Sequence, residues 1–185
     1  MRFIQNQSYV LGSVFAGSGF FHTETQQDSH TQKLLFDWAL IEIPQKRLGT
    51  NSVYRPGAHS GLPVHFGDGV DLQEGQTYHK IGSSSGYTTG VYSGLKEAII
   101  HRVLNPHTRL YETFPTLEYA IFKSAYPFMA QGDSGSLVYN GLCGNVVGPF
   151  FAASKPQGHS YITPIDDFFQ DIMKVSGASK VRMAF

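Results

Sequence analysis

Short apolar runs recur along this chain of 185 residues, and glycine, proline, serine and asparagine interrupt them. Apolar runs of this length with turn residues between them are typical of the strands of an all-β sandwich or barrel. We therefore expect an all-β fold. The candidate strands are Tyr9–Ala16, Leu34–Ile43, Thr77–Ile81, Gly90–Leu104, Leu117–Ile121, Ser136–Tyr139, Cys143–Phe151 and Tyr161–Ile162.

One helix is expected, at residues 163–177. Thr163 is a favourable N-cap residue, and Pro164 suits the first helical position. Gly177 stands where a glycine commonly ends a helix. Between them, apolar side chains recur at the spacing of one helix face, which should pack on the β-structure. They are Ile165, Phe168, Phe169 and Ile172.

Composition and charge exclude several functional classes. The chain has 14 basic and 14 acidic side chains, and the basic ones are dispersed, so we expect no nucleic-acid partner. It contains no stretch of about 18 apolar residues, and we expect no membrane partner. The histidines lack metal-ligand spacing, so neither a metal nor another cofactor is expected.

The cellular compartment stays open. The first residues carry no apolar leader, and Cys143 is the single cysteine, which is compatible with an intracellular protein. A lone cysteine cannot form an internal disulfide, so the core must supply the stability.

The segment Leu34–Ile41 places Asp37 among residues that are apolar on both faces of an expected strand. A carboxylate buried in such a strand is costly unless it is paired or hydrogen-bonded. Asp37 is therefore expected either to accept structural hydrogen bonds or to orient a catalytic histidine.

A second segment places Ser134 in a turn between Gly132 and Gly135, ahead of an apolar strand. Glycines permit backbone conformations that other residues rarely adopt. Such a turn leaves room for a substrate and allows the N–H groups of Gly132 and Ser134 to form an oxyanion hole. The same residues are ordinary components of a hairpin turn, so both interpretations stand. An α/β-hydrolase elbow is excluded, because Ser136 stands where that motif needs glycine.

The order and spacing of the two segments can be compared with those of known catalytic residues, since Asp37 precedes Ser134 by 97 positions. In the chymotrypsin order of His, Asp and Ser, roughly ninety residues separate the last two. Together with the segment Gly82–Gly90, the sequences Asp37-Trp38-Ala39-Leu40 and Gly132-Asp133-Ser134-Gly135 resemble the trypsin/chymotrypsin-like serine peptidases. The resemblance is to the disulfide-poor microbial members of that family.

The resemblance implies a chymotrypsin-like double β-barrel with an incomplete first barrel and a C-terminal α-helix. Residues 1–43 would be the remnant of the first barrel, 44–76 the interdomain connection and 77–162 the second barrel. Residues 163–177 would be the helix, packed on the body.

The resemblance also implies residue roles. Ser134 would be the nucleophile and Asp37 the acid that orients the histidine, while Gly132 and Ser134 would donate the oxyanion N–H groups. Phe128 would lie at the base of the primary specificity pocket, with Met129 and Gln131 beside it. An uncharged pocket of this kind predicts an apolar or small preference rather than one for Lys or Arg.

The sequence has no histidine at the position where this family places its general base. The family places it roughly forty-five residues before the acid, whereas thirty-six residues precede Asp37. Only His22 and His30 lie in that stretch, within a polar run that is typical of an exposed loop. We therefore expect a peptidase chain that lacks its N-terminal segment.

Two further departures follow from the same comparison. In zymogen-activated members the residue equivalent to Asp133 pairs with a freed N-terminal amine, so Asp133 here needs another partner or a different activation mechanism. The two strands left to the first barrel would have open edges. Self-association or a partner chain would cover them.

Three functions are consistent with these residues. The first is a serine endopeptidase, which hydrolyses peptide bonds through an acyl-enzyme but is incomplete or inactive as this chain. The second is a catalytically dead homologue that binds a peptide or protein. The third is an unrelated β-protein in which the serine segment is only a turn.

Overall fold

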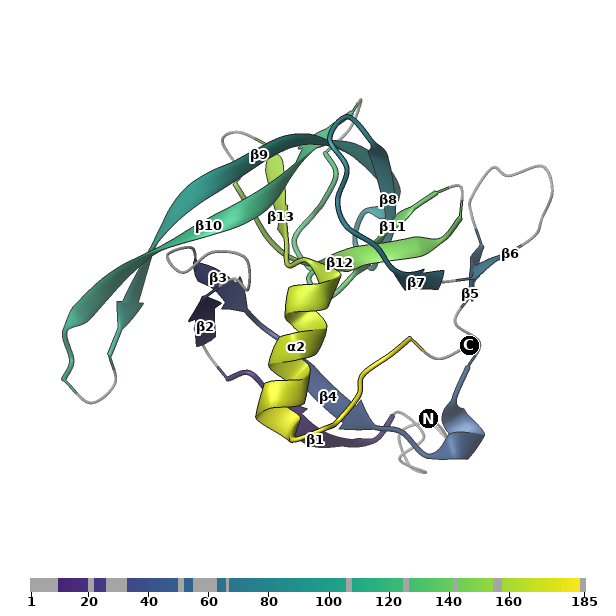
Figure 1. Cartoon of the computed structure of the whole chain (residues 1–185), viewed down its shortest axis with the longest axis horizontal. Helices are drawn as coiled ribbons and strands as arrows, with labels where there is room; N and C mark the ends of the chain where they lie inside the picture. Colours follow the sequence, from purple (N-terminus) through teal and green to yellow (C-terminus); the bar gives the residue numbers. More distant parts are fainter. Residues whose placement is uncertain are drawn as a thin grey trace, which may run out of the picture.

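The computed structural model describes residues 10–19, 22–25, 33–49, 52–54, 63–65, 67–105, 108–124, 127–141, 143–154 and 158–183. It confirms the expected fold class, because strands dominate these residues and a single α-helix follows them near the C-terminus (Figure 1). No helix in these ranges is long and apolar enough to cross a membrane.

Six antiparallel strands close into a barrel. In order around the barrel they are β8 (Thr77–Gly82), β9 (Gly86–Leu104), β10 (Tyr111–Lys123), β13 (His159–Ile162), β12 (Asn145–Ser154) and β11 (Leu137–Asn140). Closure occurs because β11 pairs with both β12 and β8. The short strand β7 (Gly67–Gly69) adds to the start of β12 in parallel.

The barrel encloses the main apolar core. It fills with inward-facing aromatic and branched side chains, as expected where alternate residues of each strand face the interior. The buried members are Tyr78, Tyr92, Ile121, Phe128, Val138, Val147, Phe150 and Ile162.

The hairpin of β9 and β10 reaches well beyond the barrel (Figure 1). Its outer part pairs Tyr111 with Leu104 and Pro115 with Ile100, whereas β8 and β13 pair only with the barrel end of the hairpin. Ile100 is 75% exposed, so one face of this arm presents apolar side chains to solvent.

The N-terminal residues form small two-stranded sheets. Strand β1 (Ser13–Gly17) pairs with β4 (Ala39–Glu42), and β2 (His22–Thr25) pairs with β3 (Lys33–Phe36). In the connecting region, a 3₁₀ turn, η1 (Gln45–Arg47), precedes the hairpin of β5 (Ser52–Tyr54) and β6 (Pro63–His65).

The prediction of one continuous strand from Leu34 to Ile43 is wrong. Asp37 and Trp38 separate β3 from β4. The break has a local cause, because Ser18 Oγ accepts a hydrogen bond of 3.0 Å from the Trp38 N–H and donates to the carbonyl of Phe36. These bonds take up backbone groups that a continuous ladder would use.

The helix α2 (Ile165–Ser176) ends at Gly177, as predicted, with a left-handed φ of 74°. Its start differs by one position, since Pro164 rather than Thr163 is the N-cap residue. Thr163 is held by other partners. Its N–H donates to the carbonyl of Pro149 and its hydroxyl to that of Leu35, at 3.1 and 3.5 Å.

The helix forms a second core with the N-terminal strands. Ile172 packs with Leu34, Phe36 and Trp38, all of which are buried. On the same helix, the buried Asp171 accepts hydrogen bonds from the Trp38 indole at 2.6 Å and pairs with His22 Nε2 at 2.8 Å. The C-terminal helix therefore holds the N-terminal unit in place.

Candidate active site

The turn that carries Ser134 lies between the barrel strands β11 and β12. Gly132 and Gly135 adopt φ values of 98° and 86°, in the region that favours glycine. The N–H of Gly135 donates to the carbonyl of Phe150 at 2.8 Å, so the turn is bonded directly to β12. Ser134 itself is exposed, and its hydroxyl donates to the carbonyl of Phe151 at 3.3 Å.

Asp133 is the anchor of this turn. Its carboxylate is buried and accepts hydrogen bonds from Lys80 Nζ at 2.8 Å and from Ser85 Oγ at 2.6 Å. Main-chain N–H groups of Ser84, Ser85 and Ala130 complete the set. Gly82 leaves the necessary space, because a β-carbon there would overlap the carboxylate.

The electrostatics of Asp133 follow from these donors. Burial on its own would raise the pKa of the Asp133 carboxyl. The hydrogen bonds from Lys80, Ser85 and the main chain outweigh burial and hold the pKa well below its ordinary value. Asp133 therefore remains a carboxylate, and its charge holds both strand β8 and the turn.

Sequence reasoning missed Lys80 as the partner of Asp133. Lys80 is the partner that the sequence left open for Asp133. A signal was present, since Lys80 stands between His79 and Ile81 in the expected strand Thr77–Ile81. Its side chain has no exposed surface, which requires a buried counter-charge.

Two main-chain N–H groups of the turn are open donors. Those of Asp133, Gly135 and Ser136 donate to carbonyls within the turn and β12. Within the described part of the chain, those of Gly132 and Ser134 have no hydrogen-bond acceptor. These are the donors expected of an oxyanion hole; that role remains a prediction.

The histidines whose side chains the structure describes all bond to residues other than Ser134. His22 pairs with Asp171, and His79 bonds to the Tyr87 hydroxyl. His101 bonds to Thr116 and His159 to Glu97. His30 lies outside the described residues.

Asp37 is exposed, so the prediction of a buried carboxylate at this position is wrong. It lies at the break between β3 and β4, where the chain turns away from the buried path of Leu34 to Phe36. Among the residues that the structure describes, no hydrogen bond or ion pair joins Asp37 to Ser134. The role of Asp37 in orienting a histidine therefore stays a prediction.

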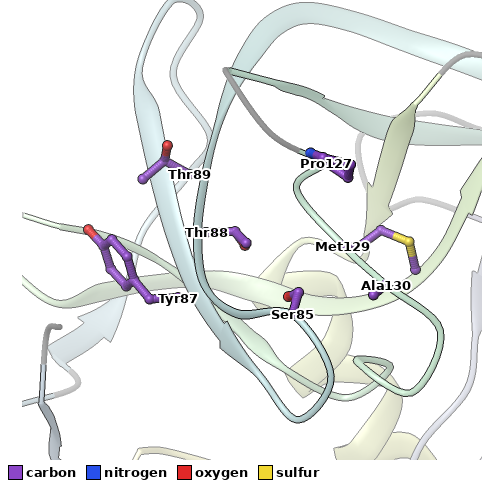
Figure 2. A pocket seen from close by; sticks show the side chains of 7 residues that line it. All are labelled: Ser85, Tyr87, Thr88, Thr89, Pro127, Met129 and Ala130. Carbon is purple, nitrogen blue, oxygen red and sulfur yellow. The ribbon is translucent and has the colours of Figure 1, made fainter.

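The expected substrate-binding residues separate into two groups. Phe128 is fully buried in the barrel core rather than on a surface that substrate could reach. Gln131 is exposed, and Met129 is half-buried. Met129 lines an open hollow of about 540 Å³ between the start of β9 and the loop 127–130 (Figure 2).

The described residues contain no cluster of three His, Cys, Asp or Glu side chains that could hold a metal ion. Cys143 is exposed in the turn before β12, whereas the sequence placed it in a strand. The neighbouring Gly144, with a φ of 75°, explains the turn, since this conformation favours glycine.

No family model matches the chain, and no curated protein matches it by sequence. Solved structures of microbial chymotrypsin-like serine proteases are similar to it in fold. Protease A of Thermobifida fusca shares 15% identity with a TM-score of 0.49, over 71% of this chain and 63% of that protein. The chain therefore spans less than two thirds of the length of the Thermobifida protease.

Two other structures show a similar level of likeness. Nocardiopsis protease shares 16% identity with a TM-score of 0.47, over 83% of this chain and 78% of that one. The chymotrypsin of Cellulomonas bogoriensis shares 16% identity with a TM-score of 0.47, over 89% and 85%.

Proposed function

We propose that this chain carries the nucleophile and the oxyanion donors of a serine endopeptidase, and that it is inactive without an added general base. One observation carries this proposal. Ser134 is exposed beside two unpaired N–H groups, on a turn that a buried ion pair anchors. An ordinary hairpin turn needs no such anchor.

The chemistry of acyl transfer assigns each group a role. The Ser134 oxygen attacks the peptide carbonyl, whose developing negative charge the N–H groups of Gly132 and Ser134 stabilise. The serine proton must move to a base in this step. In the structure the hydroxyl donates to a main-chain carbonyl, which cannot accept a proton at neutral pH.

Asp37 has the complementary role in this proposal. An exposed carboxylate is accessible to the Nδ1–H of an imidazole that binds between it and Ser134. Met129 and Gln131 would contact the substrate close to the nucleophile. The substrate is a polypeptide.

Chemical rescue tests the proposal. The chain is treated with a fluorophosphonate probe at increasing imidazole concentration, and mass spectrometry locates the label. We expect little labelling without imidazole and an increase with its concentration at Ser134. Ser134→Ala is the control and should stay unlabelled. Labelling of Ser134 that does not change with imidazole concentration would contradict the proposal.

A peptide-binding module is the second candidate. It is favoured because each imidazole that the structure describes bonds to a residue other than Ser134. Peptide affinity measured by calorimetry separates the candidates. A binding module should retain tight peptide binding in Ser134→Ala and show no rescue by imidazole. An endopeptidase site should show rescue with weak ground-state binding.

A further inference from the structure

A second open hollow lies between the middle of strand β9 and the strands β12 and β13. Its volume of about 470 Å³ falls in the range of small-molecule pockets, ~300–1,000 Å³. None of the residues that line it has a role in the proposed peptidase chemistry. They are Glu97, Ala98, Ile99, Ile100, Ala153, Ser154 and Tyr161.

Glu97 supplies the charge of this hollow, because the other described residues that line it are uncharged. Its carboxylate accepts a hydrogen bond from the Tyr161 hydroxyl at 2.5 Å and a second one from His159 Nδ1. A carboxylate can only accept, so the proton of the second bond lies on Nδ1. The two donors fix the carboxylate, yet the Glu97 side chain remains 25% exposed, and a ligand can therefore reach it.

The hydroxyl of Tyr161 stays a neutral donor to Glu97. Burial, together with the hydrogen bond to Glu97 and its charge, raises the pKa of Tyr161 to about 12. A hydrogen bond from Ser154 opposes this rise. Tyr161 therefore adds no second anion to the hollow, and its bond leaves the negative charge on Glu97.

The neighbours of Glu97 on the arm do not supply a cation to the hollow. Glu118 stands directly opposite Glu97 in the ladder of β9 and β10, so the two carboxyl groups share one face of the arm. Lys96 does not line the hollow, and its Nζ lies over the ring of Tyr119 at 4.2 Å from the ring centre. The electrostatic environment therefore favours a cationic ligand.

Apolar side chains form the rest of the lining. They stand beside the carboxylate, so one ligand can contact both parts at once. A ligand that fits has a charged head and an apolar stem, as the long basic side chains of proteins do. The apolar lining residues are Ala98, Ile99, Ile100 and Ala153.

We infer that this hollow binds a guanidinium group on a short apolar stem, as in an arginine side chain. Each oxygen of Glu97 accepts one bond from the protein and can accept another. A guanidinium presents two parallel N–H groups that match the two oxygens of a carboxylate. An ammonium presents its donors from a single atom and lacks this geometry.

Three probes with the same stem test the inference: n-butylguanidinium, n-butylammonium and the uncharged n-butylurea. Binding is followed by the ¹³C shifts of the Ile99 and Ala153 methyl groups, with the buried Ile165 of α2 as the reference. We expect a dissociation constant on the order of 1 mM for the guanidinium. The ammonium should bind about threefold more weakly and the urea about tenfold more weakly, because each lacks part of the charged, paired contact.

Two further probes identify the source of the guanidinium. Free arginine carries charged amino and carboxylate groups, whereas N-acetylarginine methylamide carries peptide groups in their place. Tighter binding of the capped compound would indicate an arginine within a polypeptide, and tighter binding of free arginine would indicate the amino acid. Both results support a guanidinium site.

Substitution locates the binding. Glu97→Gln keeps the shape of the side chain but removes its charge, and it should weaken n-butylguanidinium binding by about tenfold. Glu112→Gln, at an exposed position of β10 on the same arm, is the matched control and should leave the affinity unchanged. If Glu97→Gln does not fold, Ile100→Lys replaces it. Ile100 is 75% exposed, and a cation there should also weaken binding.

Three results would overturn the inference. They are equal affinity for n-butylguanidinium and n-butylurea, equal affinity for n-butylguanidinium and n-butylammonium, and unchanged affinity in both Glu97→Gln and Ile100→Lys. None of these measurements depends on catalysis. The inference can therefore fail while imidazole rescue at Ser134 succeeds, and the reverse is equally possible.

Discussion

Lys80 Nζ lies 2.8 Å from the carboxylate of Asp133, and both side chains are completely excluded from solvent. The pair joins strand β8 to the residue directly before Ser134. Because the cation comes from within the barrel, the turn assumes its conformation without a newly freed N-terminal amine. In our proposal, the turn that carries Gly132 and Ser134 therefore needs no freed terminus to balance the charge of Asp133.

Replacing Lys80 tests the importance of this pair. Lys80→Met leaves the Asp133 carboxylate buried without its cation, which should lower the free energy of unfolding by about 3–5 kcal/mol. Urea unfolding measures the change. Adding Asp133→Asn to this variant removes the uncompensated charge and should recover part of the loss. If Lys80→Met alone were as stable as the parent chain, the ion pair would contribute little to the free energy of unfolding.

Gly82 tests the space around the same carboxylate. In Gly82→Ala the new methyl group overlaps Asp133, so we expect a less stable chain and a loss of imidazole-dependent labelling at Ser134. Gly49→Ala is the matched control, because no described residue other than its chain neighbours comes within 4 Å of the added methyl group. The two variants should differ in melting temperature; equal values would mean that the loop moves aside at no cost.

The burial of Glu118 predicts an unusual dependence of the free energy of unfolding on pH. This side chain has no exposed surface, its Oε1 accepts the Leu35 N–H at 3.1 Å, and burial raises its pKa to about 7. Bonds from Thr116 and Leu35 and the charge of Lys96 oppose the rise. A raised carboxyl pKa means that the folded chain binds the proton more tightly than the unfolded chain does.

The sign of the pH effect follows. The contribution of Glu118 to the free energy of unfolding should be most favourable at pH values below 4.5, the ordinary glutamate pKa. It should fall by about 3 kcal/mol in total as the pH rises to about 7. Urea unfolding at several pH values measures this contribution. Glu118→Gln should remove it, whereas Glu112→Gln, at an exposed position of the same strand, should leave it in place. A pH profile that is the same in Glu118→Gln and the parent chain would contradict the assignment.

Asp171 is expected to hold the N-terminal unit on the helix. Asp171→Asn keeps an acceptor for the Trp38 indole but gives His22 a weaker, uncharged partner, so we expect a loss of about 1–3 kcal/mol. Trp38 is the single tryptophan, and its fluorescence reports unfolding at this contact. Asp166→Asn, on the exposed side of the helix, should cost no more than about 1 kcal/mol. Equal losses in the two variants would rule out a specific role for Asp171.

Local chemistry explains what could be predicted from the sequence. Gly177 ends the helix and Gly132 and Gly135 flank the serine turn because each adopts a φ that other residues rarely tolerate. Short apolar runs, with turn residues between them, were sufficient to predict an all-β fold. These features depend on neighbours in the chain.

Contacts between distant segments explain what could not be predicted. The apolar neighbours of Asp37 predict that it is buried. However, Ser18 Oγ accepts a hydrogen bond from the Trp38 N–H, and the strand is interrupted at Asp37. The pairing of Lys80 with Asp133 joins positions 53 residues apart. The neighbours of Lys80 indicate a buried cation, but in neither case does a local pattern identify the distant partner, so only the assembled structure reveals the contact.

The packing of Ile172 against Leu34 determines the order in which this protein can fold during synthesis. The barrel strands are complete once Ile162 has left the ribosome. The N-terminal strands must wait longer, because the helix that covers them follows the barrel strands in the chain. Until then their apolar side chains lack this cover, and exposed apolar surface makes a folding intermediate prone to aggregation.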